Sequence, residues 1–188
     1  MHVTGAARIA VPAVRRRAPC EPPVAHPVGG ADHRTSTVSP VTAFDTRDTP
    51  GRSGPAATTE ADPRTVGRVR TEYAPAHDGD PDPGEIVWTW VPYEENDGRG
   101  KDRPVLVVAR EPGGTLLAVQ LSSRRRDGDR DRVPIGSGPW DRSGRPSWVA
   151  VDRLLRLHEA GMRREACALD RMRFNLVVHR LRERHGRR

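Results

Sequence analysis

The chain has 188 residues and a formal net charge of +7, and 35% of its residues are hydrophobic while 30% are charged. This composition supports one ordinary globular domain rather than two, together with segments that add little to a core. No apolar run approaches the ~20 residues that span a bilayer, and two cysteines do not make a disulfide framework, so we expect a cytoplasmic protein.

Residues 1–78 form the first of two regions that the sequence distinguishes. They are rich in Pro, Gly, Ser, Thr and Ala and show no sustained period of 2 or 3.6. We therefore predict a disordered leader over residues 1–78 and one folded domain over residues 79–188. A misassigned upstream start codon is another interpretation of the leader. An Arg-rich mitochondrial presequence over residues 1–34 is a third, but the prolines at 12, 19, 22 and 23 would break the amphipathic helix that it needs.

The folded region opens with three predicted strands. Residues 84–91 alternate with a period of 2 and are mostly apolar on both faces, as a small closed barrel requires. Because Pro104 lacks an amide donor, we expect the next strand to begin there and to run through residues 105–110. Arg103 would then stand at the start of this strand. The Glu-Pro-Gly-Gly turn at residues 111–114 predicts a hairpin into an antiparallel strand over residues 115–121.

Short strands and one helix complete the chain. Strands are expected at residues 132–135 and 147–152, and the leucines at 154, 155 and 157 would finish the sheet. An apolar stripe at helical spacing predicts a terminal helix that ends near Gly186. The stripe consists of Leu169, Met172, Phe174, Val177, Val178 and Leu181.

The positive charge is concentrated at the C-terminal end. Residues 153–188 hold eleven arginines against four acidic residues. Arginine binds phosphate oxygens through a planar fork, so the composition permits nucleic-acid binding. A GC-rich genome also encodes many arginines, and composition alone therefore does not establish that function.

Metal-binding and hydrolase motifs fail on spacing. The aspartates at 78, 80 and 82 resemble the start of a calcium loop, but its sixth position is Pro83 and its twelfth is Thr89. The seven histidines show no pairing at zinc-ligand spacing. The chain also lacks a dinucleotide fingerprint, a Walker loop and a nucleophile elbow. We therefore predict no metal site and no cofactor.

Four short motifs follow one another in the folded region: Gly-Glu-Ile-Val-Trp at 84–88, Lys-Asp-Arg-Pro-Val-Leu-Val-Val at 101–108, Gln-Leu-Ser-Ser at 120–123 and Val-Asp-Arg-Leu at 151–154. In this order they resemble the PemK/MazF family of toxin endoribonucleases, over roughly residues 83–185. Two positions depart from the family pattern. Ser122 stands where threonine is commoner, which keeps the hydroxyl, and Arg153 stands where the family has glutamine.

The resemblance implies a mainly β fold, an SH3-like barrel of the PemK/MazF/CcdB type with a C-terminal α-helix. It implies metal-independent cleavage of single-stranded RNA, in which a 2′-hydroxyl attacks its own phosphate. Arg103 would place positive charge beside the developing phosphorane, and Ser122 would hydrogen-bond the scissile phosphate. The RNA-binding residues of the flanking loops would be Arg99, Lys101, Ser123 and Arg124.

The resemblance also implies three partners: RNA, a cognate antitoxin protein and a second copy of the chain in a homodimer. The protein would then be an mRNA interferase that inhibits growth, and its dimer would bury apolar surface around Trp140. A different function remains open, because the same fold also hosts a gyrase-poisoning toxin. On that alternative the chain is a non-catalytic binding protein.

Structural roles compete with these assignments. An arginine before a proline is often a solvated charge at a strand edge, and Ser122-Ser123 alone would be a turn. The arginines at 124–126 are followed by aspartates at 127, 129 and 131, which indicates a solvated loop rather than a specific RNA contact. Trp88 and Trp90 are expected in the core. Trp140 lies among glycines and a proline, so we expect it to be exposed and able to stack on a base.

Overall fold

The computed structural model of the protein describes residues 49–186 except 68, 77–79, 96 and 125–127, without the side chains of 164–166. Residues 1–48 of the predicted leader and residues 125–127 of the arginine loop lie outside the described residues. The described chain is mainly β with one C-terminal α-helix, which confirms the predicted fold class. Its elements in chain order are β1 (Thr59–Glu60), β2 (Glu85–Pro92), β3 (Gly100–Arg110), β4 (Leu116–Ser122), β5 (Arg132–Gly136), β6 (Ser147–Ala150), β7 (Leu155–Leu157), the 3₁₀ helix η2 (Glu159–Gly161), β8 (Met162–Ala168) and α1 (Arg171–His185).

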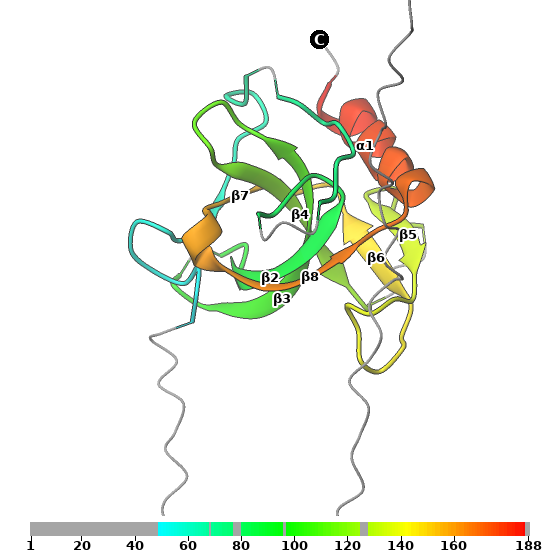
Figure 1. Ribbon diagram of the computed structural model, residues 1–188, viewed down its shortest axis with the longest axis horizontal. Helices are drawn as coiled ribbons and strands as arrows, with labels where there is room; N and C mark the ends of the chain where they lie inside the picture. Colours follow the sequence, from blue (N-terminus) through cyan, green and yellow to red (C-terminus); the bar gives the residue numbers. More distant parts are fainter. Residues whose placement is uncertain (1–48, 68, 77–79, 96, 125–127, 187–188) are drawn as a thin grey trace, which may run out of the picture.

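The strands form a curled antiparallel sheet, seen in Figure 1. Its order is β1-β7-β4-β3-β2-β8, and the hairpin partners β5 and β6 join it where β6 pairs with the end of β4. In Figure 1, β2, β3 and β8 sweep together across one side, while α1 lies beside β5. The result is a half-barrel in which β4 pairs with β7 near its start and with β6 at its end.

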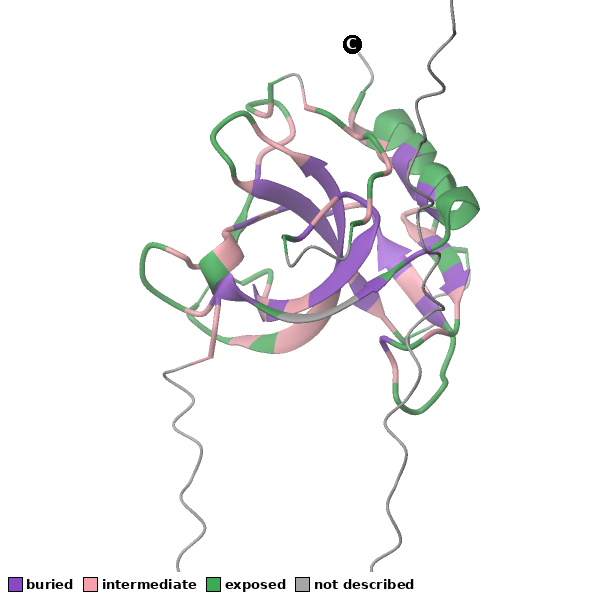
Figure 2. Ribbon diagram, viewed as in Figure 1, coloured by how far each residue is buried: buried purple, intermediate pink, exposed green. Residues whose placement is uncertain are grey.

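Two apolar clusters pack on the two faces of the central strands. Alternate residues of a strand point to opposite faces, so in β3 Leu106 and Val108 join the cluster under α1, whereas Val105 and Val107 join the cluster that also holds Met162. Figure 2 shows the central strands buried along much of their length. Burial on both faces explains why these strands read as nearly continuous apolar runs.

Strand β3 begins earlier than predicted, at Gly100 instead of Pro104. Pro104 pairs with Trp88 of β2, while the pairing of β3 with β4 extends only as far as Val105. The missing amide of Pro104 can therefore face the side where no ladder bond is formed. Arg103 consequently lies within a paired strand, and its backbone is held from one side by β2.

Strand β8 has no counterpart among the predicted elements. Its sequence, Met-Arg-Arg-Glu-Ala-Cys-Ala, lacks an apolar alternation. Within the described part of the chain it pairs with β2 alone, at the edge of the sheet, and its register shifts between Ile86 and Trp88. Charged residues are common on such edges because they discourage pairing with other chains. They also interrupt the apolar alternation by which a strand is predicted from the sequence.

The helix α1 follows the prediction closely, with one exception. The side chain of Asp170 caps its first turn by accepting the backbone N–H of Arg173 at 3.0 Å, and Gly186 ends it. Phe174 and Val177 are buried as expected, whereas Met172 is 81% exposed and does not belong to the buried stripe. None of the helices in the described part of the chain has the length and apolar character that a membrane crossing demands.

The prediction of a disordered leader through residue 78 is wrong for residues 49–67 and 69–76. Ala61 is buried in the cluster under α1, and β1 pairs with β7. Tyr73 packs against the ring of Phe174 at a centroid distance of 5.3 Å and donates its hydroxyl to the carbonyl of Leu169 at 2.7 Å. These apolar residues are too widely spaced to make a periodic pattern, yet each fills a place on the barrel surface.

Candidate functional site

The two predicted catalytic residues lie at the same end of neighbouring strands. In the antiparallel pair β3 and β4, Val105 lies opposite Gln120. This is the last pair that the two strands form, and Ser122 pairs with Trp148 of β6. Arg103 and Ser122 each stand two residues beyond that pair, on the strand face of Val105 and Gln120. The fold thus places at the same end of neighbouring strands two residues that are nineteen positions apart in the sequence.

Arg103 is half-buried and available for an anion. It lies opposite Thr89 of β2, and in the described part of the chain its guanidinium makes no ion pair and no hydrogen bond. The neighbouring carboxylate does not neutralise it, because Asp102 projects from the other face of β3 and pairs with Arg163. A guanidinium in proteins stays charged and offers five donors.

Ser122 keeps one useful donor. Its hydroxyl oxygen accepts the backbone N–H of Arg124 at 3.1 Å, which folds the chain back at the end of β4. The hydroxyl hydrogen is not used in this bond and can be donated to a ligand. Ser123 and Arg124 follow as exposed residues, so the turn presents the predicted RNA-binding positions beside the predicted catalytic one.

The other two predicted RNA-binding residues differ in availability. Arg99 is exposed but already paired: its Nε lies 2.6 Å from Asp97 Oδ2, and its backbone N–H donates to Oδ1 at 3.0 Å. These bonds, the backbone one first, hold the pKa of Asp97 below its usual value. Lys101 is exposed in β3, and its side chain makes no ion pair among the described residues. Lys101 is therefore the more available cation.

Arg153, noted in the sequence only as a departure from the family pattern, is a buried structural hub. Its side chain is 8% exposed, and its Nε lies 2.7 Å from Glu60 Oε2. It also donates to the carbonyl of Pro92 at 2.7 Å and to that of Tyr93 at 3.5 Å. Those carbonyls begin the loop that carries Arg99. No spacing in the sequence links positions 60, 92 and 153, so this role could not be predicted.

The prediction that Trp140 is an exposed stacking platform is wrong. Trp140 is 6% exposed, and its indole N–H donates to the hydroxyl of Ser147 at 3.1 Å. The small residues around it give the ring room to turn inward: a Cβ on Gly138 would lie 2.2 Å from the ring. Trp88 and Trp90, predicted to be core, are instead half-buried, and Arg52 stacks over the Trp90 ring at 4.8 Å.

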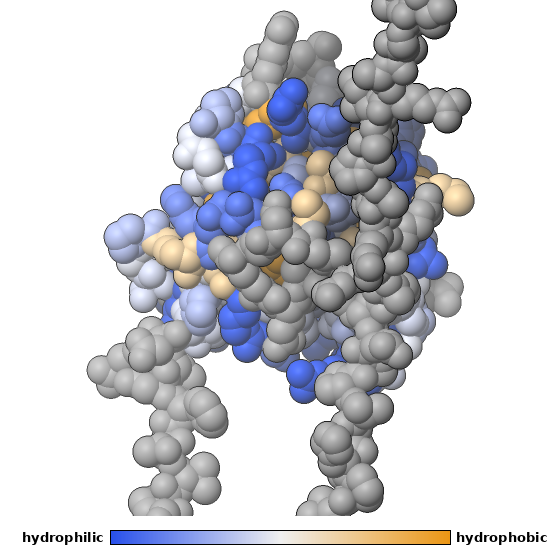
Figure 3. Space-filling view, viewed as in Figure 1, coloured by the Kyte–Doolittle hydropathy of each residue, from blue (hydrophilic) through white to orange (hydrophobic). Residues whose placement is uncertain are grey.

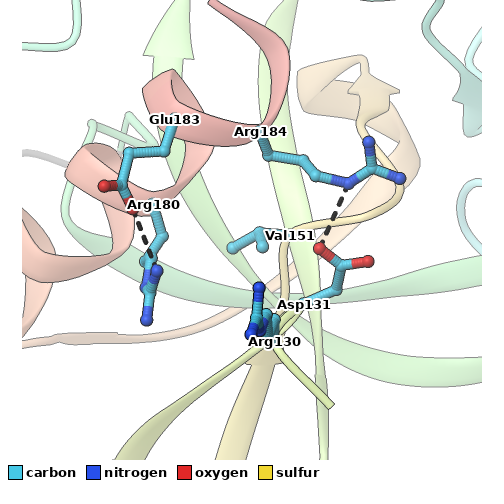
Figure 4. A pocket seen from close by; sticks show the side chains of 6 residues that line it. All are labelled: Arg130, Asp131, Val151, Arg180, Glu183 and Arg184. Carbon is cyan, nitrogen blue, oxygen red and sulfur yellow. Dashed lines mark hydrogen bonds and ion pairs between the residues drawn. The ribbon is translucent and has the colours of Figure 1, made fainter.

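A second basic feature lies beside the C-terminal half of α1. A pocket of about 470 Å³ is lined by Arg130, Asp131, Val151, Arg180, Glu183 and Arg184. Figure 4 shows that two of its arginines are already paired: Arg184 Nε lies 3.1 Å from Asp131 Oδ1, and Arg180 lies 3.0 Å from Glu183. Elsewhere, the face drawn in Figure 3 is largely hydrophilic with small apolar patches.

Among the described residues, no three His, Cys, Asp or Glu side chains gather as a metal site requires. The groups at the β3–β4 end are positive charges and hydroxyl and amide donors. These groups suit a phosphodiester, which carries negative charge and many acceptor oxygens.

Comparison with known proteins identifies one family. The family model for the PemK-like, MazF-like toxin of type II toxin-antitoxin system matches residues 82–184, which is more than half of the chain. No curated protein matches.

Several solved structures are similar at low identity. A MazE-MazF complex from Deinococcus radiodurans is 20% identical, and the match covers 57% of this chain and 97% of that chain with a TM-score of 0.42. The Mycobacterium tuberculosis toxin MazF-mt6 is 16% identical over 53% of this chain and 96% of that chain, with a TM-score of 0.39. A mycobacterial endoribonuclease is 16% identical over 57% of this chain and 93% of that chain, with a TM-score of 0.40. At these TM-scores the family model alone carries the assignment.

Proposed function

The chain belongs to the family of PemK-like, MazF-like toxins of type II toxin-antitoxin systems, and from this premise we propose that it is an endoribonuclease that cleaves single-stranded RNA in the cytoplasm. The observation that carries the proposal is the placement of Arg103. Its guanidinium has no ion pair among the described residues, and it shares a strand face and a strand end with the hydroxyl of Ser122. The residues of the surrounding turn and loop supply further hydrogen-bond donors to the phosphates of RNA.

The cleavage chemistry follows from these groups. The 2′-oxygen of a ribose forms a bond to the adjacent phosphorus, and the bond from phosphorus to the 5′-oxygen breaks. The 2′-hydroxyl loses its proton, the departing 5′-oxygen takes one up, and a 2′,3′-cyclic phosphate remains. Negative charge develops on the nonbridging oxygens during this step. Arg103 would stabilise that charge, Ser122 would donate a hydrogen bond to the same phosphate, and Lys101 would hold the flanking backbone.

The test is cleavage of a long RNA by the purified protein in EDTA, with the cut ends mapped. We expect fragments that end in a cyclic phosphate. Intact RNA together with growth inhibition on expression would contradict the proposal and would favour the alternative, a non-catalytic toxin of the same fold.

Two protein partners belong to the same proposal. The family consists of toxins of two-component systems, so we propose that a cognate antitoxin with an acidic segment competes with RNA for the basic surface. We also propose a homodimer. Its interface cannot use Trp140, which is buried within one copy. The large apolar side chains that are exposed on the described surface are Met172 and Leu176, one turn apart on α1, and they are the proposed contact.

A further inference from the structure

The segment Thr49–Glu60 lies outside the region matched by the family model, yet it is bound to the strand next to Arg103. We name this segment the strap. The backbone N–H of Trp90 in β2 donates to the carbonyl of Pro50 at 3.3 Å, and the N–H of Thr58 donates to the carbonyl of Gly51 at 2.8 Å. In Figure 1 the strap is the cyan loop beside η2, next to the end of β2. It is thus a bent segment that is fastened at one end of the half-barrel.

Thr89 is the residue through which the strap meets the candidate site. It is 1% exposed, and its hydroxyl donates to the carbonyl of Gly161 at 2.7 Å. Because the single hydroxyl hydrogen of Thr89 is used in that bond, the hydroxyl of Thr58 must be the donor in the 2.8 Å bond that joins the two threonines. Thr89 is also the direct cross-strand neighbour of Arg103. A displacement of Thr89 therefore displaces the strand position that faces Arg103.

The far end of the strap holds the loop on the other side of β2. Glu60 pairs with Arg153 at 2.7 Å, and Arg153 binds the carbonyl of Pro92 at 2.7 Å. Arg153 is buried, so its bond to the carbonyl of Pro92 is shielded from water, although the carboxylate of Glu60 is itself 58% exposed. Through this connection the strap constrains the start of the loop that carries Arg99.

We propose that the strap is a positioning element for RNA cleavage: it holds Thr89 and, through Arg153, the Arg99 loop, and thereby fixes Arg103 for transition-state binding. This inference rests on the proposed endoribonuclease function. An error of about 1 Å in the position of such a group can cost about 10²-fold in rate, so an element that acts through Thr89 has a measurable effect without touching RNA.

Two glycines of the strap provide a matched test. Both have positive φ, +82° at Gly51 and +76° at Gly54, so replacement by alanine strains the backbone equally. A Cβ at Gly51 would lie 2.4 Å from the hydroxyl of Thr89 and 2.5 Å from the carbonyl of Gly161, whereas a Cβ at Gly54 meets nothing within 4 Å. Gly51→Ala therefore forces the strap away from Thr89, and Gly54→Ala is its control.

The measurement is single-turnover and steady-state cleavage of one RNA oligonucleotide by the full chain, well below the unfolding temperature. We expect Gly51→Ala to lower kcat by about 10- to 100-fold with little change in KM, and Gly54→Ala to lower kcat less than about twofold. In the background of Arg103→Ala, Gly51→Ala should have no further effect, because the strap acts through Arg103. Equal kcat values for the two glycine variants, or additive losses in the double variant, would overturn the proposal.

A second pair of variants covers the case in which Gly51→Ala does not fold. Thr58→Val removes the hydroxyl that binds Thr89 while keeping the side-chain shape, and Thr58→Ser retains the donor. We expect Thr58→Val to lose kcat and Thr58→Ser to recover most of it. The two failures are distinguishable: no cleavage by the unaltered chain refutes the endoribonuclease function itself, whereas full activity of Arg103→Ala leaves that function standing and removes the catalytic assignment of Arg103, and with it the role of the strap. An active chain that needs Arg103 but tolerates Gly51→Ala and Thr58→Val refutes only the role of the strap.

Discussion

At the scale of single residues, two arginines of similar sequence context have opposite environments. Arg103 is half-buried without an ion pair among the described residues, whereas Arg153 is buried with a carboxylate and two carbonyls as partners. The first arrangement leaves charge available for a ligand. In the second arrangement the contacts of the guanidinium stabilise the fold, because a buried guanidinium is stable only when its donors are satisfied.

Replacing Arg103 by alanine is expected to lower the RNA cleavage rate by about 10²- to 10³-fold, the usual loss for one transition-state donor. Ser122→Ala should cost less, because it removes one neutral hydrogen bond. The measurement is single-turnover cleavage, with circular dichroism to confirm the fold. Arg142→Ala, at an exposed arginine of the β5–β6 loop, is the control and should cleave normally. Normal cleavage by Arg103→Ala would remove its catalytic assignment.

Replacing Arg153 by methionine is expected to destabilise the protein by about 1–3 kcal/mol, because the carbonyls of Pro92 and Tyr93 lose their donor. Glu60→Gln should cost less, since that carboxylate is 58% exposed and water can replace the pair. Urea denaturation of both variants gives the free energies of unfolding. Equal values for the two variants would show that the carbonyl bonds contribute nothing.

At the scale of elements, an ion pair adds to the strand pairing that joins the β3–β4 hairpin to β7. Arg156 binds both carboxylate oxygens of Glu111, at 2.7 and 2.8 Å, and the hydroxyl of Thr115 donates to Glu111 at 2.6 Å. The bonds from Arg156, followed in effect by that from Thr115, hold the pKa of Glu111 below its usual value against the opposing effect of burial. The turn itself is closed by the N–H of Glu111, which donates to the carbonyl of Thr115 at 2.8 Å.

The stability contributed by Glu111 should therefore disappear in acid. A carboxylate whose pKa is lower in the folded state stabilises the protein above its unfolded pKa, near 4.3, and the contribution is lost as pH falls through the folded pKa. We expect Glu111→Gln to lose about 1–2 kcal/mol at neutral pH and to approach the unaltered protein below the folded pKa. Urea denaturation across this range measures it. Glu72→Gln, at an exposed residue, is the control, and a difference for Glu111→Gln that does not change with pH would contradict the account.

At the scale of the whole molecule, charge and apolar exposure are concentrated on the C-terminal part. Arginines from α1 and from the segment before β5 line the pocket of Figure 4, and Met172 and Leu176 are exposed on the same helix. A basic, partly apolar helix on an otherwise closed core suits association with a second protein. The candidate cleavage residues lie on the strand face away from the α1 cluster. A protein bound to α1 would therefore not cover them.

Sedimentation at micromolar concentration is expected to show a dimer, and Met172→Glu or Leu176→Glu should shift it toward monomer by placing charge in the contact. Pro112→Glu, at the exposed β3–β4 turn, is the control and should sediment as the unaltered chain does. RNA binding should weaken with salt, with a slope of roughly −0.7 per neutralised phosphate of a single strand. A monomer at all concentrations, or salt-independent RNA binding, would contradict this picture.

The sequence by itself determined the elements whose local pattern agrees with their final environment. Strand β2 forms where its mostly apolar residues predict it, the Glu-Pro-Gly-Gly turn is a hairpin, and α1 ends at Gly186 as its pattern predicts. The motif around Arg103 and Ser122 also identified residues that the fold brings to one strand end. Each of these signals is carried by neighbouring residues, so it can be read before the chain is folded.

Only the tertiary structure decided the features that depend on distant partners. The described segments at residues 49–67 and 69–76 have too few apolar residues for a pattern, but Ala61 and Tyr73 each fill a site made by α1 and the strands. Strand β8 exists because β2 offers an edge, and Trp140 is buried because Ser147 accepts its N–H. The hub at Arg153 joins residues 93 positions apart. Such long-range contacts stabilise a segment only after the rest of the barrel has formed, so they cannot be predicted from the local propensity of the segment.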